Sequence, residues 1–330
     1  MIMNKLTAIF NPEVFQGRGK RHSYFEGWYF KVVNASETKA YAFIPGIALD
    51  EAGNRQSFIQ VLDGKKRLSH YHKFDIHSFV AAPGAFTIAI GDNHFSHDSI
   101  NLNVPGLKGI LHFKDGIRWP SHWYSPGIMG PFSFVPFMEC YHGIVSMDHA
   151  VFGRLEIEDE IIDFDNGRGY IEKDWGRSFP SAYVWMQSNH FTTPGISLKA
   201  SVAKIPWIGK SFTGFIAGLW VNDRLLQFTT YNWSSVRKLS IDSSRIELIL
   251  ANTKHSLEII VSRDAATSLA SPIRGFMNGR IEESMTSRVE VSVTDKKTGR
   301  AIFRDCGRNA AIEVAGSISE ILHPFKDGAK

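Results

Sequence analysis

Three carboxylic acids lie in segments that are rich in aromatic residues. Glu26 stands within Tyr24–Lys31, where period-two alternation predicts a strand that carries Glu26 between Tyr24 and Trp28 on one face. A carboxyl group withdrawn from water tends to keep its proton, so it could act as a general acid. The alternative is a structural role, in which Glu26 pairs with a nearby Lys or Arg and closes the end of a barrel.

The other two acids, Glu172 and Asp174, belong to the segment Gly167–Phe191. We expect two strands here, joined by a tight turn at Gly176–Pro180. Alternation places Glu172 and Asp174 on one face of the first strand with Tyr170. The opposite face carries Ile171, Lys173 and Trp175, and the second strand aligns Trp185, Gln187, Asn189 and Phe191.

This mixture of aromatic and polar side chains is poor core material, because each buried polar atom needs a partner. Apolar walls with a few aimed polar groups are typical of a ligand pocket. The segment 167–191 is therefore predicted to line an apolar-ligand site. The alternative is a hydrogen-bond network between two domains, and the two readings are compatible.

Metal and nucleotide chemistry have little support in the sequence. The 13 histidines include the spaced pairs His70 with His72 and His142 with His149, but no third ligand is placed beside either pair. Phosphate-binding loops, a dinucleotide fingerprint, zinc-protease motifs and the serine-hydrolase elbow are all missing. We predict no metal and no cofactor.

The elements that must position these residues are short strands. Runs of β-branched and aromatic residues recur at roughly ten-residue spacing between Gly, Asn, Asp and Pro turns, and helical periodicity is almost absent. The prediction is an all-β chain with two antiparallel β-barrels or sandwiches, formed by residues 1–178 and 179–330. Asp264–Phe276 is the best candidate for a short helix or an irregular insertion.

Composition limits the classes of function. The 330 residues carry a net charge of +4 without a concentrated basic stripe, which argues against nucleic-acid binding. The first ten residues lack the features of a signal peptide, and no apolar run is long enough for a membrane helix. Cys140 and Cys306 are isolated, as in a reducing compartment, so a cytoplasmic protein is expected.

The segment Trp119–Pro136 is unusual because it is both loop-like and apolar. Exposed apolar area is costly, so the segment is expected either to pack as a lid or to meet a lipid-like partner. The lid is the favoured reading, and peripheral contact with a membrane is the alternative. The sequence predicts no oligomeric state.

Several of these segments together resemble the tocopherol cyclase family. The resemblance covers roughly residues 11 to 191, and the closing Ala311–Gly316 agrees more weakly. The matching blocks are Asn11-Pro12, Tyr24–Lys31, Ser125–Pro131, Met138–Gly143, Ser146–His149 and Gly169–Gly176, with Trp185, Gln187 and Asn189. A more distant likeness links the family to carotenoid 1,2-hydratases, which implies two lipocalin-like barrels.

The resemblance also implies a reaction. Such a cyclase needs no redox cofactor: an acid protonates a prenyl double bond, and a phenol oxygen attacks the tertiary cation. Implied acids are Glu172, Asp174 and Glu26, with Glu172 favoured because plant members commonly carry an amide at the position of Asp174. Implied substrate-binding residues are Trp28, Tyr29, Tyr141, His142, Tyr170, Lys173, Trp175, Trp185, Gln187 and Asn189.

The expected partner is an apolar small molecule, either a prenylated quinol or another isoprenoid. The absence of a plastid transit peptide suggests a bacterial relative with its own substrate. Hydration of the double bond is a variant of the same chemistry. A lipocalin-like carrier without catalysis is the competing function, and a buried unpaired acid would argue against it.

Overall fold

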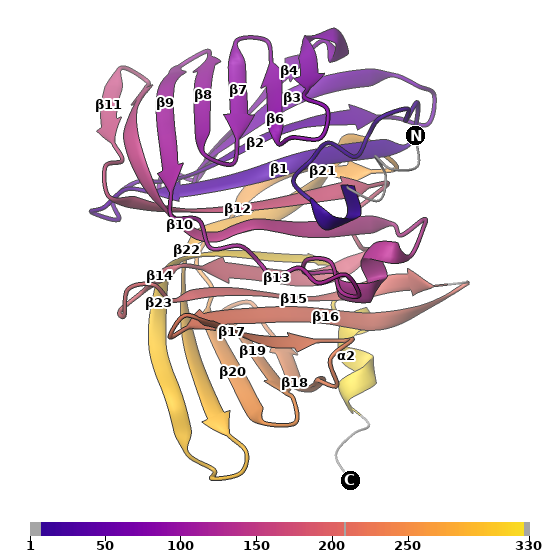
Figure 1. Cartoon of the computed structure of the whole chain (residues 1–330), viewed down its shortest axis with the longest axis vertical. Helices are drawn as coiled ribbons and strands as arrows, with labels where there is room; N and C mark the ends of the chain where they lie inside the picture. The colour runs from indigo at the N-terminus through magenta and orange to yellow at the C-terminus, as the bar shows by residue number, and fades with distance from the viewer. Residues whose placement is uncertain (1–7, 208, 327–330) are drawn as a thin grey trace. The chain divides into compact units, whose positions relative to one another are not determined.

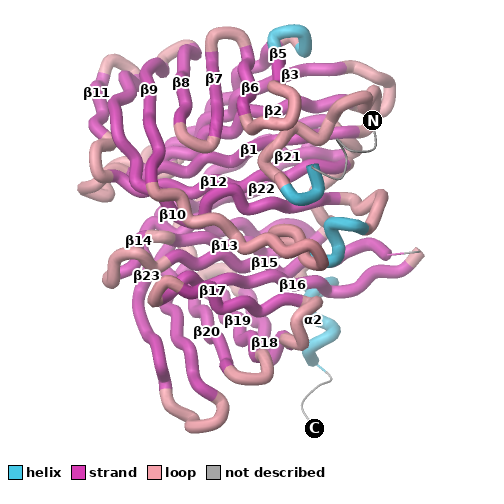
Figure 2. The backbone as a smooth tube through the Cα atoms, in the orientation of Figure 1, coloured by secondary structure: helices cyan, strands magenta, loops and turns pink. Residues whose placement is uncertain are grey.

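The computed structural model describes residues 8–207 and 209–326, and nearly all of them lie in strands or the turns between them (Figures 1 and 2). The chain divides into two compact units. The first comprises residues 1–179 and 269–280, and the second comprises 180–268 and 281–330. The predicted all-β, lipocalin-like architecture is confirmed.

The first unit is built on one antiparallel sheet with the strand order β4-β3-β2-β1-β12-β10-β9-β8-β7-β6-β5, and β11 pairs with β10. Its elements are β1 (Tyr24–Val33), β2 (Ala40–Leu49), β3 (Arg55–Asp63), β4 (Leu68–Phe74), η1 (Ile76–Ser78), β5 (Phe79–Ala81), β6 (Thr87–Ile90), β7 (Asn93–Ser96), β8 (Ser99–Val104), β9 (Leu107–Lys114), η2 (Gly130–Phe134), β10 (Cys140–Ile157), β11 (Glu160–Asp163) and β12 (Gly167–Gly176).

The sheet of the first unit curls around an aromatic core. The Phe30 ring on β1 lies 6.1 Å from Phe86, 5.7 Å from Phe95 and 6.1 Å from Phe113, centroid to centroid. Phe86 immediately precedes β6, which is far from β1 in the strand order. Strands distant in the sheet therefore meet across one interior, as a barrel requires.

The second unit has a sheet ordered β17-β16-β15-β13-β23-β22-β20-β19-β18, with β14 paired to β23 and β21 to β22. Val184, Leu219, Leu248 and Val291, from four strands, are fully or almost fully buried in its core. Its elements are β13 (Ala182–Ser188), β14 (His190–Phe191), β15 (Ser197–Trp207), β16 (Lys210–Val221), β17 (Arg224–Thr229), β18 (Ser235–Ile241), β19 (Arg245–Ala251), β20 (His255–Ser262), β21 (Thr267–Ile273), β22 (Phe276–Asp295), β23 (Ala301–Gly316) and α2 (Ser319–Lys326).

The expectation of a helix or irregular insertion at 264–276 is wrong. β21 and the start of β22 form a hairpin whose two-residue turn, Arg274-Gly275, has φ values of +48° and +89°. Paired positive φ values match the twist of the flanking strands, so they favour a tight hairpin. The Ser, Pro and Gly residues here serve a turn and two strands.

This hairpin tip, residues 269–280, belongs to the first unit although it follows β20 in the chain. Gln60 on β3 binds the Ala270 backbone twice, accepting from its N–H at 2.9 Å and donating to its carbonyl at 3.4 Å. Leu49 donates its backbone N–H to the Gly275 carbonyl at 3.0 Å. A Cβ atom at Gly275 would lie 2.2 Å from the Leu49 carbonyl oxygen, so only glycine fits.

In the described part of the chain, no helix is long and apolar enough to cross a membrane.

Candidate functional site

The acids of Gly167–Phe191 are positioned by three neighbouring strands, β1, β12 and β10. The register pairs Tyr29 with Glu172, Gly27 with Asp174, and Asp174 in turn with His142. Residues opposite one another across an antiparallel pair share a face. The predicted alternation of β12 is thus seen, and His142 joins Glu172 and Asp174 on the same side.

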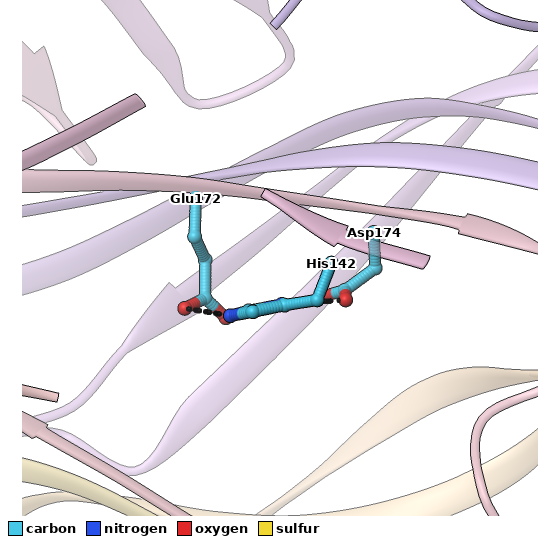
Figure 3. Close-up of side chains that lie close together, drawn as sticks. All are labelled: His142, Glu172 and Asp174. Atoms are coloured by element: carbon cyan, nitrogen blue, oxygen red, sulfur yellow. Dashed lines mark hydrogen bonds and ion pairs between the residues drawn. The ribbon is translucent and has the colours of Figure 1, made fainter. Parts of the chain in front are cut away.

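His142, Glu172 and Asp174 form a compact cluster, which we call the acid cluster (Figure 3). The Nδ1 atom of His142 lies 2.8 Å from Oδ1 of Asp174, and its Nε2 atom lies 3.6 Å from Oε2 of Glu172. The Tyr170 hydroxyl donates a hydrogen bond to the same Glu172 oxygen. The Glu172 side chain is only 6% exposed, so its surroundings contain little water.

The tyrosine and the cysteine beside the acid cluster keep their protons. Burial, followed by the nearby charge of Glu172, raises the pKa of Tyr170 well above its usual value, so its hydroxyl stays a donor. Burial likewise raises the pKa of the Cys140 thiol.

The same three residues could hold a cation. One ligand atom from each lies within 4.8 Å of the others, and histidine with two carboxylates suits several divalent transition metals. The sequence placed no third ligand beside its histidine pairs because β10 and β12 meet only in the folded sheet. The expected absence of a metal remains a prediction.

Glu26 lies on the opposite face of the sheet, in a separate arrangement. Its carboxylate is 2.6 Å from Nζ of Lys173, and both side chains are completely buried. It also accepts hydrogen bonds from the Tyr24 hydroxyl at 2.6 Å and the Gln16 backbone at 2.8 Å. The carboxylate thus accepts from three donors and forms the ion pair that the structural alternative described.

Lys173 ties this ion pair to the N-terminal segment. Its ammonium donates to the carbonyls of Pro12 and Val14, at 2.8 and 2.6 Å. It also lies 4.8 Å from the ring centroid of Trp28 and 4.7 Å from that of Trp175. Each indole therefore already has a cation against one of its faces.

The remaining predicted residues fall into two groups, one in each unit. Tyr29 shares the face of the acid cluster, whereas Tyr141 stacks on Trp175 at 5.5 Å and donates its hydroxyl to the Val135 carbonyl. The others lie in the second unit and are buried: Trp185, Gln187 and Asn189. Trp185 and Gln187 lie on one face of β13, opposite Glu313 and Ala311 of β23.

A small pocket lies elsewhere in the first unit. His70 and His72, on β4, line it together with Tyr41, Asp63 and Glu158. Burial, and then the neighbouring His70, lowers the pKa of His72. No member of the acid cluster lines this pocket, so the two sites are separate.

Comparison with known proteins places these features in a family. Residues 111–316 match the family model described as tocopherol cyclase-like. The chloroplastic tocopherol cyclase of Zea mays is 24% identical over 194 residues, which cover 55% of this chain and 40% of that protein. The chain thus matches less than half the length of its plant relative.

Solved structures agree in fold. The structure of CghA with Sch210972 matches with a TM-score of 0.54 and 10% identity, covering 89% of each chain. Kievitone hydratase from Nectria haematococca matches with a TM-score of 0.50 and 11% identity, over 89% of this chain and 88% of that one. At such low identity these likenesses concern the fold alone.

Proposed function

The chain belongs to the tocopherol cyclase-like family, and from that premise we propose that it protonates a prenyl double bond of an apolar isoprenoid or quinol and thereby closes a ring. The observation that carries the proposal is the acid cluster. A catalyst of this kind needs a proton donor in a dry environment, and Glu172 is a buried carboxyl with a tyrosine and a histidine beside it.

Each member of the acid cluster has a proposed role, and so does Tyr170 beside it. Glu172 delivers the proton, because its side chain is less exposed than that of Asp174, the other acid on this face. Tyr170 holds the reactive oxygen in position through its hydrogen bond. His142 accepts or returns a proton at Nε2, while Asp174 orients the imidazole through Nδ1.

The reaction balances without an oxidant or reductant. The Glu172 proton adds to the less substituted alkene carbon and leaves a tertiary cation at the neighbouring carbon. The substrate's phenol oxygen forms a bond to that cation and releases its own proton, which returns to the cluster. The product is an isomer of the substrate, and attack by water in place of the phenol would give a hydrate.

The cation needs an electron-rich surface and exclusion of water. Tyr29 and Tyr170 flank Glu172 on the same face and are the aromatic candidates there. We leave Glu26, Trp28 and Trp175 out of the chemistry, since Lys173 engages all three. A substrate-binding role for Trp185, Gln187 and Asn189 stays a prediction.

Turnover in D₂O tests the proposal. The purified chain is incubated with a prenylated hydroquinone kept reduced, and the products are separated by chromatography and weighed by mass spectrometry. Protonation of the double bond predicts a product that carries one non-exchangeable deuterium at the former alkene carbon. A cyclised product otherwise has the substrate's mass, and a hydrate is heavier by one water.

Variants assign the acid. Glu172→Gln should reduce turnover by about 100-fold or more, the scale of a general acid's contribution. Glu282→Gln, at an exposed position in the second unit, is the matched control and should keep full turnover. Tight binding of the quinol by the wild type with no product would instead indicate the carrier function, and equal activity in Glu172→Gln would exclude Glu172 as the acid.

A further inference from the structure

The segment between β9 and β10 exposes aromatic side chains to solvent. Trp123 is 82% exposed, Tyr124 is 56%, Phe134 is 44% and Phe137 is 97%. Four exposed large hydrophobic side chains thus fall within fifteen residues. We call them the aromatic tips. Single exposed hydrophobic residues are ordinary, but a group of this kind marks an interaction surface.

The base of the same segment is firmly packed. Trp119, Ile128, Met129 and Met138 are buried, with exposures from 1% to 9%. The Ser133 hydroxyl donates to the Pro126 carbonyl at 3.0 Å and thereby joins the two halves of the segment. The aromatic tips therefore project from an anchored support, and the predicted lid packs only at its base.

Charge points to the kind of partner. Residues 119–138 contain no Asp, Glu, Lys or Arg. Arg118, 61% exposed and paired with Glu13, precedes the segment. At its far end the exposed Arg177 donates its backbone N–H to the Glu139 carbonyl at 2.8 Å. Glu13 and Glu139 balance these two arginines locally, so the segment is an uncharged aromatic surface of the kind that indole and phenol rings give to a lipid interface. The net charge of +4 on the whole chain favours a lipid surface that is anionic.

We infer that the aromatic tips dock this protein on the surface of an anionic lipid bilayer. Trp123 and Tyr124 contact each other, with ring centroids 5.4 Å apart, and their polar atoms suit the headgroup region. Phe134 and Phe137 lack such atoms and reach toward the acyl chains. The inference does not depend on the proposed reaction, although an apolar substrate would be concentrated at the same surface.

Co-sedimentation of the full chain with vesicles tests the inference. The vesicles contain phosphatidylcholine with about one quarter phosphatidylglycerol, so that their surface is anionic. The affinity of the double variant Trp123→Ser/Phe137→Ser for the vesicles should fall by about tenfold or more, because two large apolar side chains no longer enter the interface. Trp233→Ser is the matched control, since Trp233 is 91% exposed in the second unit between Asn232 and Ser234.

The inference is supported if the wild type binds the vesicles, the double variant binds more weakly, and Trp233→Ser binds as the wild type does. Wild-type protein that stays in the supernatant with excess lipid overturns it, as does an equal loss in Trp233→Ser. Sedimentation velocity without lipid tests the alternative partner, a second copy of the chain. A wild-type dimer that is lost in the double variant would assign the aromatic tips to a protein interface and overturn the inference. Phe137→Ser alone replaces the double variant if the latter misfolds, and turnover of detergent-dispersed substrate reports separately on the reaction.

Discussion

Acid should weaken the first unit through one residue, His149 on β10. Its side chain is almost completely buried, and its ring lies 4.5 Å from that of Phe113. The Ser146 hydroxyl donates to the Asp148 carbonyl, so it accepts from Nδ1 of His149 at 3.0 Å. That bond assigns the proton to Nδ1. It leaves Nε2 bare against Gly169, where a Cβ atom would lie 2.2 Å away.

The size of the effect follows from the pKa. Burial lowers the pKa of His149 from 6.5 to about 3. Between these values the unfolded chain binds the proton and the folded chain does not, so stability is complete above pH 6.5 and falls as the pH drops toward 3. Each pKa unit is worth about 1.4 kcal/mol, which gives about 5 kcal/mol in full and about 3 kcal/mol by pH 4.5.

Urea unfolding of the wild type and of His149→Asn, at about pH 7.5 and about pH 4.5, measures this contribution. Asparagine keeps a donor near Nδ1 and does not titrate, so its free energy of unfolding should fall with acid by about 3 kcal/mol less than that of the wild type. His112→Asn, at an exposed position on β9, controls for the loss of an imidazole. The same acid sensitivity in all three proteins would refute the assignment to His149.

Three further predictions concern the other buried features. Glu26→Gln should destabilise the protein by about 3–5 kcal/mol in urea unfolding, because the Lys173 ammonium stays buried without its carboxylate; a much smaller loss in Glu26→Gln/Lys173→Met would confirm that cause, and an equal loss would contradict it. Dialysis against a chelator should leave turnover unchanged if the acid cluster works through protons, and restoration of lost activity by one divalent metal would show a metal centre. Gly275→Ala should lower the melting temperature by several degrees, since its Cβ collides with β2; an unchanged melting temperature would show that the hairpin is dispensable.

The alternation of residues along the chain predicted which side chains share a face of a strand, but not which strands pair with each other. Tyr170, Glu172 and Asp174 share a face as alternation requires, because the period of a strand is a property of the backbone itself. The partner His142 lies about thirty residues away, on a strand whose bulges shift its register twice. Nothing in the sequence near His142 specifies which residue of β12 it opposes.

Long-range pairing also supplies the partner of Glu26. The sequence allowed either a general acid or an ion pair, since both need a carboxylate among aromatic residues. Lys173 forms the ion pair from a strand that the sequence separates from Glu26 by nearly half the chain. The hairpin at 264–276 was missed for a related reason: its Pro and Gly residues are turn signals, and its partners on β2 and β3 are remote in sequence.

The hairpin tip has a consequence for protein synthesis. The first unit includes residues 269–280, so its last piece leaves the ribosome 280 − 179 = 101 residues after its main part. At about 5–20 residues per second this is a delay of roughly 5–20 seconds. During that interval Gln60 and the Leu49 amide lack their partners on Ala270 and Gly275. The nascent chain then has these polar groups of β2 and β3 uncovered, and this is the period when a chaperone would be of most use to it.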